Sequence, residues 1–143
     1  MAKVLITTVP FGETNHIPLE MLEKEGIDFL INPYNKKITE DQLADLVTDF
    51  DVIIAGTEPI TERVMKRASK LKLISRVGIG LDSVDLIASQ KRGIKVSYTP
   101  DAPSPAVAEL TIGLMLCLLR SIHLSNSQMH RGKWYRHFGR RLE

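Results

Sequence analysis

The sequence has almost no cysteine and no long apolar segment. Its 143 residues include one cysteine, Cys117, which excludes an internal disulfide framework. The longest apolar run covers eight residues, 112–119, whereas a membrane-spanning helix needs about 20. The first residues lead directly into the apolar stretch 4–6, without the long apolar region and cleavage site of a secretory signal. We therefore expect a cytoplasmic protein with no membrane contact.

Acidic residues are nearly absent from the last part of the chain. From residue 120 onward there are six Lys or Arg residues and one acidic residue, Glu143, although the whole chain has a formal net charge of only +2. A basic segment of this kind can bind nucleic acid. We interpret it instead as a solvated linker segment that meets a partner domain. We expect no nucleic-acid partner.

Short apolar segments alternate with helical patterns along most of the chain. The hydrophobic share of 43% and the charged share of 25% are typical of one soluble globular domain. Strands are predicted at 4–9, 27–31, 51–55, 71–77 and 94–98, and helices at 17–24, from Thr39 through Val47, from Thr61 through Ala68, and at 83–90 after an Asp82 cap. This order predicts an α/β fold, a flavodoxin-like doubly wound parallel sheet of five strands, over residues 1–103.

A long apolar helix follows the last strand. Ser104 is a good N-cap and Pro105 suits the first helical turn, so we expect a helix from Ser104 to about residue 125 within a linker segment, 104–143. Its apolar residues cover more than one face, which is more than a single sheet face can bury. We therefore expect the helix to pack against another domain, and its exposed surface to favour a homodimer.

The most informative loop follows the fourth strand, at the sheet edge where ligands bind in open α/β sheets. Glycines at 78 and 80 allow a close approach of the backbone and expose amide donors, which suits an anion such as a carboxylate. A dinucleotide fingerprint is the alternative interpretation, and Asp101 lies at a suitable distance for it. Ser83 replaces its third glycine, however, and three strand–helix units precede it, whereas the fingerprint normally opens the first.

Other chemistry is not indicated. His123, His130 and His137 are seven residues apart, about 10 Å along a helix, which is too far for one metal ion. No Ser-His-Asp or Cys-His arrangement stands out, and Cys117 lies in an apolar run with no activating neighbour. We therefore expect no metal site, and these residues indicate no catalytic nucleophile.

Several long motifs resemble one known family. The strand and loop LISRVGIGLDSVD (residues 73–85), the segment GIKVSYTPDA (93–102), the helix AVAELTIGLM (106–115) and the end around Gly132-Lys133-Trp134 are similar, in the same order, to D-isomer-specific 2-hydroxyacid dehydrogenases. That group contains the phosphoglycerate dehydrogenases. The resemblance extends over essentially the whole chain and implies the substrate-binding, or catalytic, domain of such an enzyme.

The resemblance implies roles for individual residues. The amides of Val77 and Gly78 would hold the substrate carboxylate, and Ile79 would line the nicotinamide side of the cleft. Pro103 stands where many members have an asparagine that orients the reacting carbonyl, so that Ser104 would partly take over this role.

The resemblance also implies a dependence on parts that this sequence lacks. Members that use phosphoglycerate often have an arginine where this chain has Ala55. The absence of this arginine weakens the case for a phosphorylated substrate without excluding it. The fingerprint glycines and the catalytic arginine, glutamate and histidine would follow this sequence in a dinucleotide-binding domain. We expect NAD as the cofactor, bound mainly by that domain, and a small 2-hydroxy or 2-keto acid as the substrate.

Two further hypotheses stay open at this point. The first is a stand-alone ligand-binding or regulatory module of the same fold, similar to a co-repressor. The second is an unrelated flavodoxin-like protein such as a receiver domain. A receiver needs acidic residues after the first strand to bind Mg²⁺, whereas this chain has Thr7-Thr8-Val9-Pro10 there, which argues against it.

Overall fold

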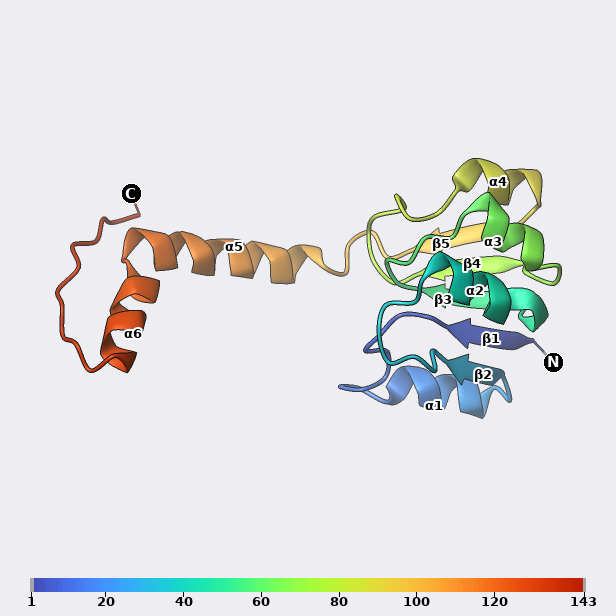
Figure 1. Ribbon diagram of the computed structural model, residues 1–143, viewed down its shortest axis with the longest axis horizontal. Coiled ribbons are helices and arrows are strands. Elements are labelled where there is room, and N and C mark those ends of the chain that lie inside the picture. The colour runs from blue at the N-terminus through green and yellow to red at the C-terminus, as the bar shows by residue number, and fades with distance from the viewer. Residues whose placement is uncertain (1, 143) are drawn as a thin grey trace. The chain divides into compact units, whose positions relative to one another are not determined.

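The computed structural model describes residues 2–142, which form two compact units that divide after Pro100. The first unit alternates strands and helices (Figure 1). Its elements are β1 (Lys3–Ile6), α1 (Ile17–Lys24), β2 (Asp28–Ile31), α2 (Glu40–Leu46), the 3₁₀ turn η1 (Val47–Asp49), β3 (Val52–Ala55), α3 (Glu62–Arg67), β4 (Leu73–Arg76), α4 (Leu86–Lys91) and β5 (Lys95–Tyr98).

The five strands form one parallel sheet in the order β2-β1-β3-β4-β5. This confirms the predicted flavodoxin-like doubly wound fold. The strands are shorter than predicted: β1 ends at Ile6 rather than at Val9, and β4 covers only Leu73–Arg76. The chain changes direction between β1 and β3, so that the loops after these two strands diverge and leave a crevice at the carboxyl edge of the sheet.

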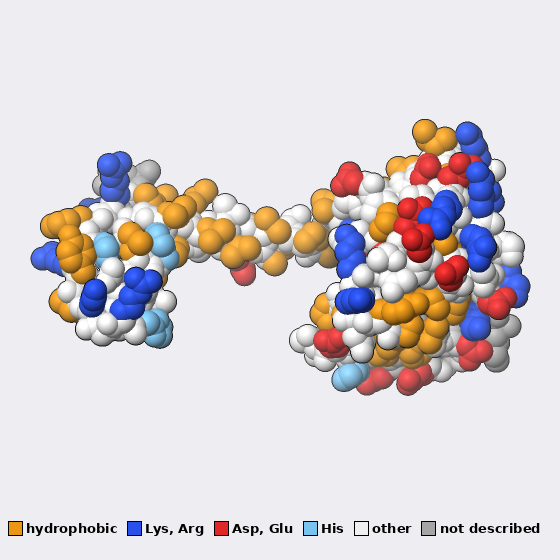
Figure 2. Space-filling view, in the orientation of Figure 1, with side chains coloured by type: hydrophobic (Ala, Val, Ile, Leu, Met, Phe, Trp, Pro, Cys, Tyr) orange, Lys and Arg blue, Asp and Glu red, His pale blue; other side chains and the backbone are white. Residues whose placement is uncertain are grey.

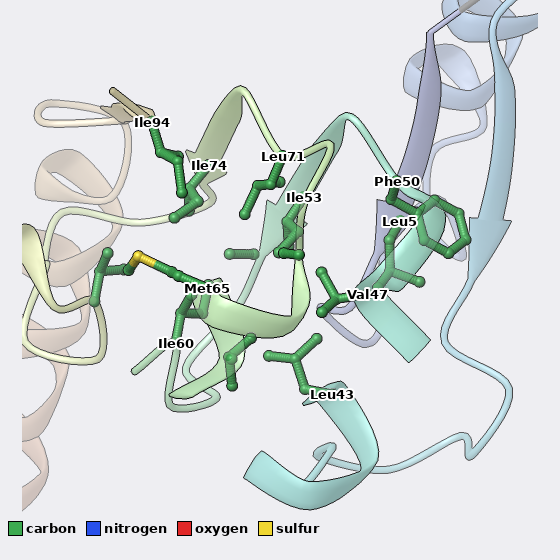
Figure 3. Packing of buried hydrophobic residues seen from close by; sticks show 14 of the residues in the cluster. Leu5, Leu43, Val47, Phe50, Ile53, Ile60, Met65, Leu71, Ile74 and Ile94 are labelled. Atoms are coloured by element: carbon green, nitrogen blue, oxygen red, sulfur yellow. The ribbon is translucent and has the colours of Figure 1, made fainter. Parts of the chain in front are cut away.

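One face of the sheet carries the hydrophobic core of the first unit. Helix α3 contacts both α2 and α4, and the strand residues that point toward these helices are fully buried (Figure 3). The members of the cluster labelled in Figure 3 are Leu5, Leu43, Val47, Phe50, Ile53, Ile60, Met65, Leu71, Ile74 and Ile94. Because β1, β3 and β4 each contribute buried side chains to this cluster, the core fixes the three strand ends that form the site.

The other face is less well covered. The crossover to α1 runs in the opposite direction from the later ones, and the right-handed rule for such connections places α1 on this face. Helix α1 covers the predicted residues 17–24, but none of its residues is buried, and Leu19 and Leu22 are only half-buried. On β3 and β4, Val52, Ile54 and Leu73 remain partly exposed on alternate positions.

Two of the three predicted helix caps in the first unit are confirmed, and one is wrong. Thr39 caps α2 in a capping box with Gln42, and Thr61 caps α3 by accepting from the Val64 amide, as predicted. The predicted Asp82 cap is wrong. Asp85 caps α4 instead, with its Oδ1 accepting from the Ala88 amide at 2.9 Å, so that this helix begins only at Leu86.

The second unit contains α5 (Ser104–Leu119) and α6 (Ile122–His130). Two predictions fail here. Pro103, not Ser104, precedes the helix, and no side chain caps it; the helix also ends at Leu119 instead of continuing to residue 125, because Ser121 adopts the left-handed conformation at φ 51°. No residue of α5 is buried, and its apolar side chains line the surface of the helix (Figure 2).

Among residues 2–142 no single helix is both long and apolar enough to span a membrane. Helices α5 and α6 meet the length and composition criteria only together, as a pair bent by 68°.

Candidate functional site

Polar residues surround a cavity where β1, β3 and β4 end. The cavity has a volume of about 200 Å³, and its lining comes from the three strand ends and from one loop residue, Lys37. The lining residues are Thr7, Thr8, Val9, Lys37, Gly56, Thr57, Glu58, Arg76 and Val77. A second cavity of about 190 Å³ shares Thr57 and Arg76 with the first. The two cavities therefore lie at the crevice that the sheet topology creates.

A buried polar network forms the floor of the first cavity. Glu58 is only 2% exposed, and its Oε1 accepts hydrogen bonds from the Gly56 amide at 2.9 Å and from the Thr7 hydroxyl. Asn32 is equally buried and donates from Nδ2 to the carbonyls of Thr7, at 3.1 Å, and of Lys36, at 2.9 Å. These bonds satisfy buried polar groups that would otherwise be costly, and they hold the loop that carries Lys37 against the end of β1.

Arg76 is the last residue of β4 and the least well paired member of the site. It is 9% exposed, and its Nη1 donates to the Val77 carbonyl. Its buried Nε has no hydrogen-bond partner, and no carboxylate of residues 2–142 forms an ion pair with it. A buried guanidinium without an acidic partner is uncommon, because charged groups are costly to remove from water.

Gly78 follows β4 in a conformation that other residues rarely adopt. Its φ is +141°, and a Cβ added there would lie 2.6 Å from Nη1 of Arg76. The Gly78 amide donates to the Thr99 hydroxyl at 2.8 Å, and the Thr99 amide donates back to the Gly78 carbonyl at 3.1 Å. The glycine is therefore required both by the backbone geometry and by the guanidinium that packs against it.

The structure locates the predicted site residues in two different units. Val77, Gly78 and Ile79 form one loop, in which the Val77 and Ile79 side chains are 43% and 56% exposed. The Val77 amide donates to the Ala55 carbonyl at 2.9 Å, so both amides expected to hold a carboxylate already have partners in the chain. Ser104 belongs to the second unit, and its predicted role stays a prediction.

The predicted helix N-terminus behind this loop is wrong. Because α4 begins at Leu86, residues 82–83 form a turn and Val84 a bridge, where the sequence predicts a first helical turn. A bridge between Ile60 and Val84 holds this segment against the β3–α3 connection, with the Ile60 amide donating to the Ser83 carbonyl at 2.7 Å. The loop thus provides individual backbone donors and a cation, but no helix dipole.

Sequence reasoning missed the four buried polar residues Thr7, Asn32, Glu58 and Arg76. Only Arg76 gives a local signal, since it is a charged residue at the end of a strand that is otherwise mostly apolar. The others become significant only once the sheet order brings their loops together.

A family model described as D-isomer specific 2-hydroxyacid dehydrogenase, catalytic domain, matches residues 11–138. The chain is 42% identical over 101 residues to a D-3-phosphoglycerate dehydrogenase of Methanocaldococcus jannaschii, covering 69% of this chain and 19% of that protein. It is 35% identical over 119 residues to a hydroxypyruvate reductase of Thermotoga maritima, covering 79% of this chain and 39% of that protein.

Structural comparison gives a similar result. The NAD⁺-bound 3-phosphoglycerate dehydrogenase of Entamoeba histolytica matches with a TM-score of 0.76 and 29% identity, over 99% of this chain and 42% of that chain. The chain thus spans between about a fifth and two fifths of the length of these relatives.

Proposed function

Because the chain belongs to the D-isomer-specific 2-hydroxyacid dehydrogenase family, we propose that it is the substrate-binding part of an NAD-dependent oxidoreductase acting on the CH–OH group of a D-2-hydroxy acid. The relatives named above act, by their names, on phosphoglycerate and hydroxypyruvate, which are both small 2-hydroxy or 2-keto acids. The fold and the motifs of residues 73–85 support the same class of substrate.

The Gly78 loop is the observation that carries this proposal. The Thr99 hydroxyl oxygen lies 2.8 Å from the Gly78 nitrogen and marks a position where an acceptor oxygen fits. A substrate carboxylate oxygen would replace it, a step that exchanges one hydrogen bond for a stronger, charge-assisted one. Val77, whose amide donates to the Ala55 carbonyl at 2.9 Å, is the second proposed contact of the carboxylate. The Arg76 guanidinium, which packs against Gly78, would add a positive charge behind the loop.

This chain offers little to a dinucleotide. A pyrophosphate needs a glycine-rich turn that leads into a helix, whereas Gly80 is followed by a turn at residues 82–83 and a bridge at Val84, and the helix begins only at Leu86. The pyrophosphate therefore does not fit here. The exposed Ile79 side chain suits an apolar contact with the nicotinamide, and NAD, which supplies the hydride acceptor, would be held mainly by a domain outside this chain.

Calorimetric titration of the chain with D-glycerate and L-glycerate tests the proposal. We expect the D-enantiomer to bind with measurable heat and the L-enantiomer to bind more weakly. With NAD added, the chain alone should produce no NADH, because the acid–base residues implied by the resemblance are not in it. If neither enantiomer binds, the substrate assignment is contradicted. Turnover that depends on a residue of this chain would contradict the assignment of the acid–base chemistry to another domain.

We further propose a cytoplasmic homodimer, supported by the low cysteine content and by the apolar surface of α5. The Leu118 side chain is 69% exposed and Met115 is 48% exposed. Light scattering should show that wild-type chain self-associates and that Met115→Glu or Leu118→Glu shifts it toward monomer, whereas Glu109→Gln on the same helix leaves it unchanged. A wild-type monomer at high micromolar concentration would contradict this part of the proposal.

A further inference from the structure

The hydroxyl group of Thr99 occupies the place that the proposed function assigns to a substrate carboxylate oxygen. Thr99 follows β5, and its Oγ1 accepts a hydrogen bond from the Gly78 amide at 2.8 Å. A threonine hydroxyl can accept and donate at the same time. The hydrogen bonds in which hydroxyl groups of residues 2–142 donate include none from Thr99, so its hydrogen is available to a ligand.

The backbone of Thr99 is fixed independently of its hydroxyl. Its amide donates to the Gly78 carbonyl at 3.1 Å, and the preceding residue, Tyr98, is the register partner of Arg76 on β4. Thr99 is exposed, which leaves room for its side chain to turn. Because threonine has few allowed χ1 rotamers, a change between two of them moves the hydroxyl away from Gly78 while the backbone stays in place.

Val77, the other proposed contact of the carboxylate, has less to offer. Its amide already donates to the Ala55 carbonyl at 2.9 Å, and this acceptor is a backbone group of the sheet that cannot turn away. Val77 can therefore only share its hydrogen between two acceptors, which gives a weaker bond. A carboxylate has two oxygen atoms, and each needs a donor once it has left water. The Gly78 amide satisfies one of them, and the Thr99 hydroxyl, next to it, still has a hydrogen to donate.

We propose that Thr99 is a substrate-binding residue with two roles. In the empty site its hydroxyl accepts from the Gly78 amide. When a 2-hydroxy acid binds, one carboxylate oxygen takes this position, the Thr99 side chain turns, and its hydroxyl donates to the carboxylate. This inference rests on the proposed function, in which the Gly78 loop holds the carboxylate. The alternative is a purely structural hydroxyl that closes the end of the β4–β5 ladder and stays on Gly78 when a ligand binds.

Nuclear magnetic resonance distinguishes these two roles in the wild-type chain. Three-bond couplings of the Thr99 methyl carbon report the χ1 rotamer, and we expect them to change as D-glycerate saturates the site. Thr61, whose Oγ1 accepts from the Val64 amide in α3, is the control and should keep its couplings. Unchanged couplings of Thr99 at saturation would show that the hydroxyl stays on Gly78, and would overturn the proposed role.

Three variants measure the contribution of the hydroxyl by calorimetric titration with D-glycerate. Thr99→Val keeps the shape of the side chain but removes the hydroxyl, and we expect about tenfold weaker binding, because a charge-assisted hydrogen bond is lost. Thr99→Ser keeps the hydroxyl and should restore most of the affinity. Ser97→Ala removes another exposed hydroxyl of β5 and should leave the affinity unchanged.

The outcomes separate the role of Thr99 from the proposed function. If D-glycerate does not bind to the wild type, the proposed function is overturned, and the role of Thr99 with it. If the wild type binds and Thr99→Val binds equally well, the Gly78 loop holds the carboxylate without the hydroxyl, and only the role of Thr99 is disproved. A serine variant as weak as the valine variant would also disprove it, because the effect would then come from the shape of the side chain. The coupling measurement uses the wild type and decides the result if Thr99→Val does not fold.

Discussion

Charged residues at the two edges of the sheet in the first unit differ in whether they form ion pairs. At the amino edge, Asp51 accepts hydrogen bonds from the Lys3 amide at 3.1 Å and from Lys72 Nζ at 2.8 Å. At the carboxyl edge, Arg76 and Glu58 are buried beside a cavity and form no ion pair with any of residues 2–142. At the amino edge the charges form ion pairs, whereas at the crevice Glu58 accepts hydrogen bonds from neutral groups and Arg76 keeps an unpaired Nε.

The pairing at the amino edge lowers the pKa of two carboxyl groups. The hydrogen bond from Lys72, together with the Lys3 amide, lowers the pKa of Asp51, and the Asp49–Lys70 pair lowers the pKa of Asp49. Ion pairs exposed to water contribute little to stability because solvent screens them. Substitutions at this edge should therefore have small effects on stability and none on ligand binding, while substitutions at the carboxyl edge should affect both.

The largest effect is expected for Gly78→Val. The substitution forces a β-branched residue into a positive φ and against the Arg76 guanidinium, and it closes the space for the substrate carboxylate. We expect D-glycerate binding to be lost, as measured by calorimetry. Gly93→Val is the matched control, since Gly93 has φ +67° but no atom within 4 Å of an added Cβ. It should lose about 1–3 kcal/mol of stability and still bind. Equal D-glycerate binding by the Gly78 and Gly93 variants would contradict the assignment of the Gly78 loop to the substrate site.

An intermediate effect is expected for Glu58. Glu58→Ala leaves the buried Gly56 amide and Thr7 hydroxyl without their acceptor, which should lower the free energy of unfolding by about 1–3 kcal/mol in urea titrations. Glu58→Gln keeps an acceptor oxygen, so it should lower the free energy of unfolding by less than Glu58→Ala does. It should also strengthen anion binding, because it removes a negative charge from the cavity. The exposed Glu62→Ala serves as the surface control. If the glutamine variant is as unstable as the alanine variant, the charge and not the hydrogen bond holds the loop.

The smallest effect is expected for Asp51→Asn at the amino edge. Because the folded-state pKa of Asp51 lies below its ordinary value of 3.8, its ionised form stabilises the fold above that value, and this contribution is lost as the pH falls through the lowered pKa. The wild type should therefore be slightly more stable than the variant at neutral pH, and the difference should shrink on acidification. Ligand affinity should not change. A difference that grows at low pH would contradict the sign of this shift.

Much of the fold follows from the sequence because its signals are local. Apolar strands separated by helical patterns predict the parallel sheet, and Thr39 and Thr61 cap their helices as expected. Asp82 and Asp85 are equally suitable caps by composition. The bridge between Ile60 and Val84 keeps the residues before Asp85 out of the helix, which leaves Asp85 to cap it. The helix break at Ser121 could not be predicted in this way, because no glycine or proline lies next to it.

The candidate site is only partly visible in the sequence. The glycines at 78 and 80 mark the loop, since their conformational freedom is a property of the residue itself. The pairing of its amides with Ala55 and Thr99, and the meeting of Glu58 with Thr7, depend on which strands are neighbours. Contacts of this kind are set by the sheet order, and a strand pattern read along the chain does not contain them.

The most direct test of the central claim follows the backbone amides of both edges by nuclear magnetic resonance while D-glycerate is added. We predict saturable shifts at Gly78, Ile79 and Thr99, because the substrate carboxylate replaces the Thr99 hydroxyl at the Gly78 amide. The amides of Lys3 and Lys72, at the amino edge, should not shift. Shifts centred on the amino edge, or an unchanged Gly78 amide at saturation, would contradict the assignment of the carboxyl edge as the substrate site.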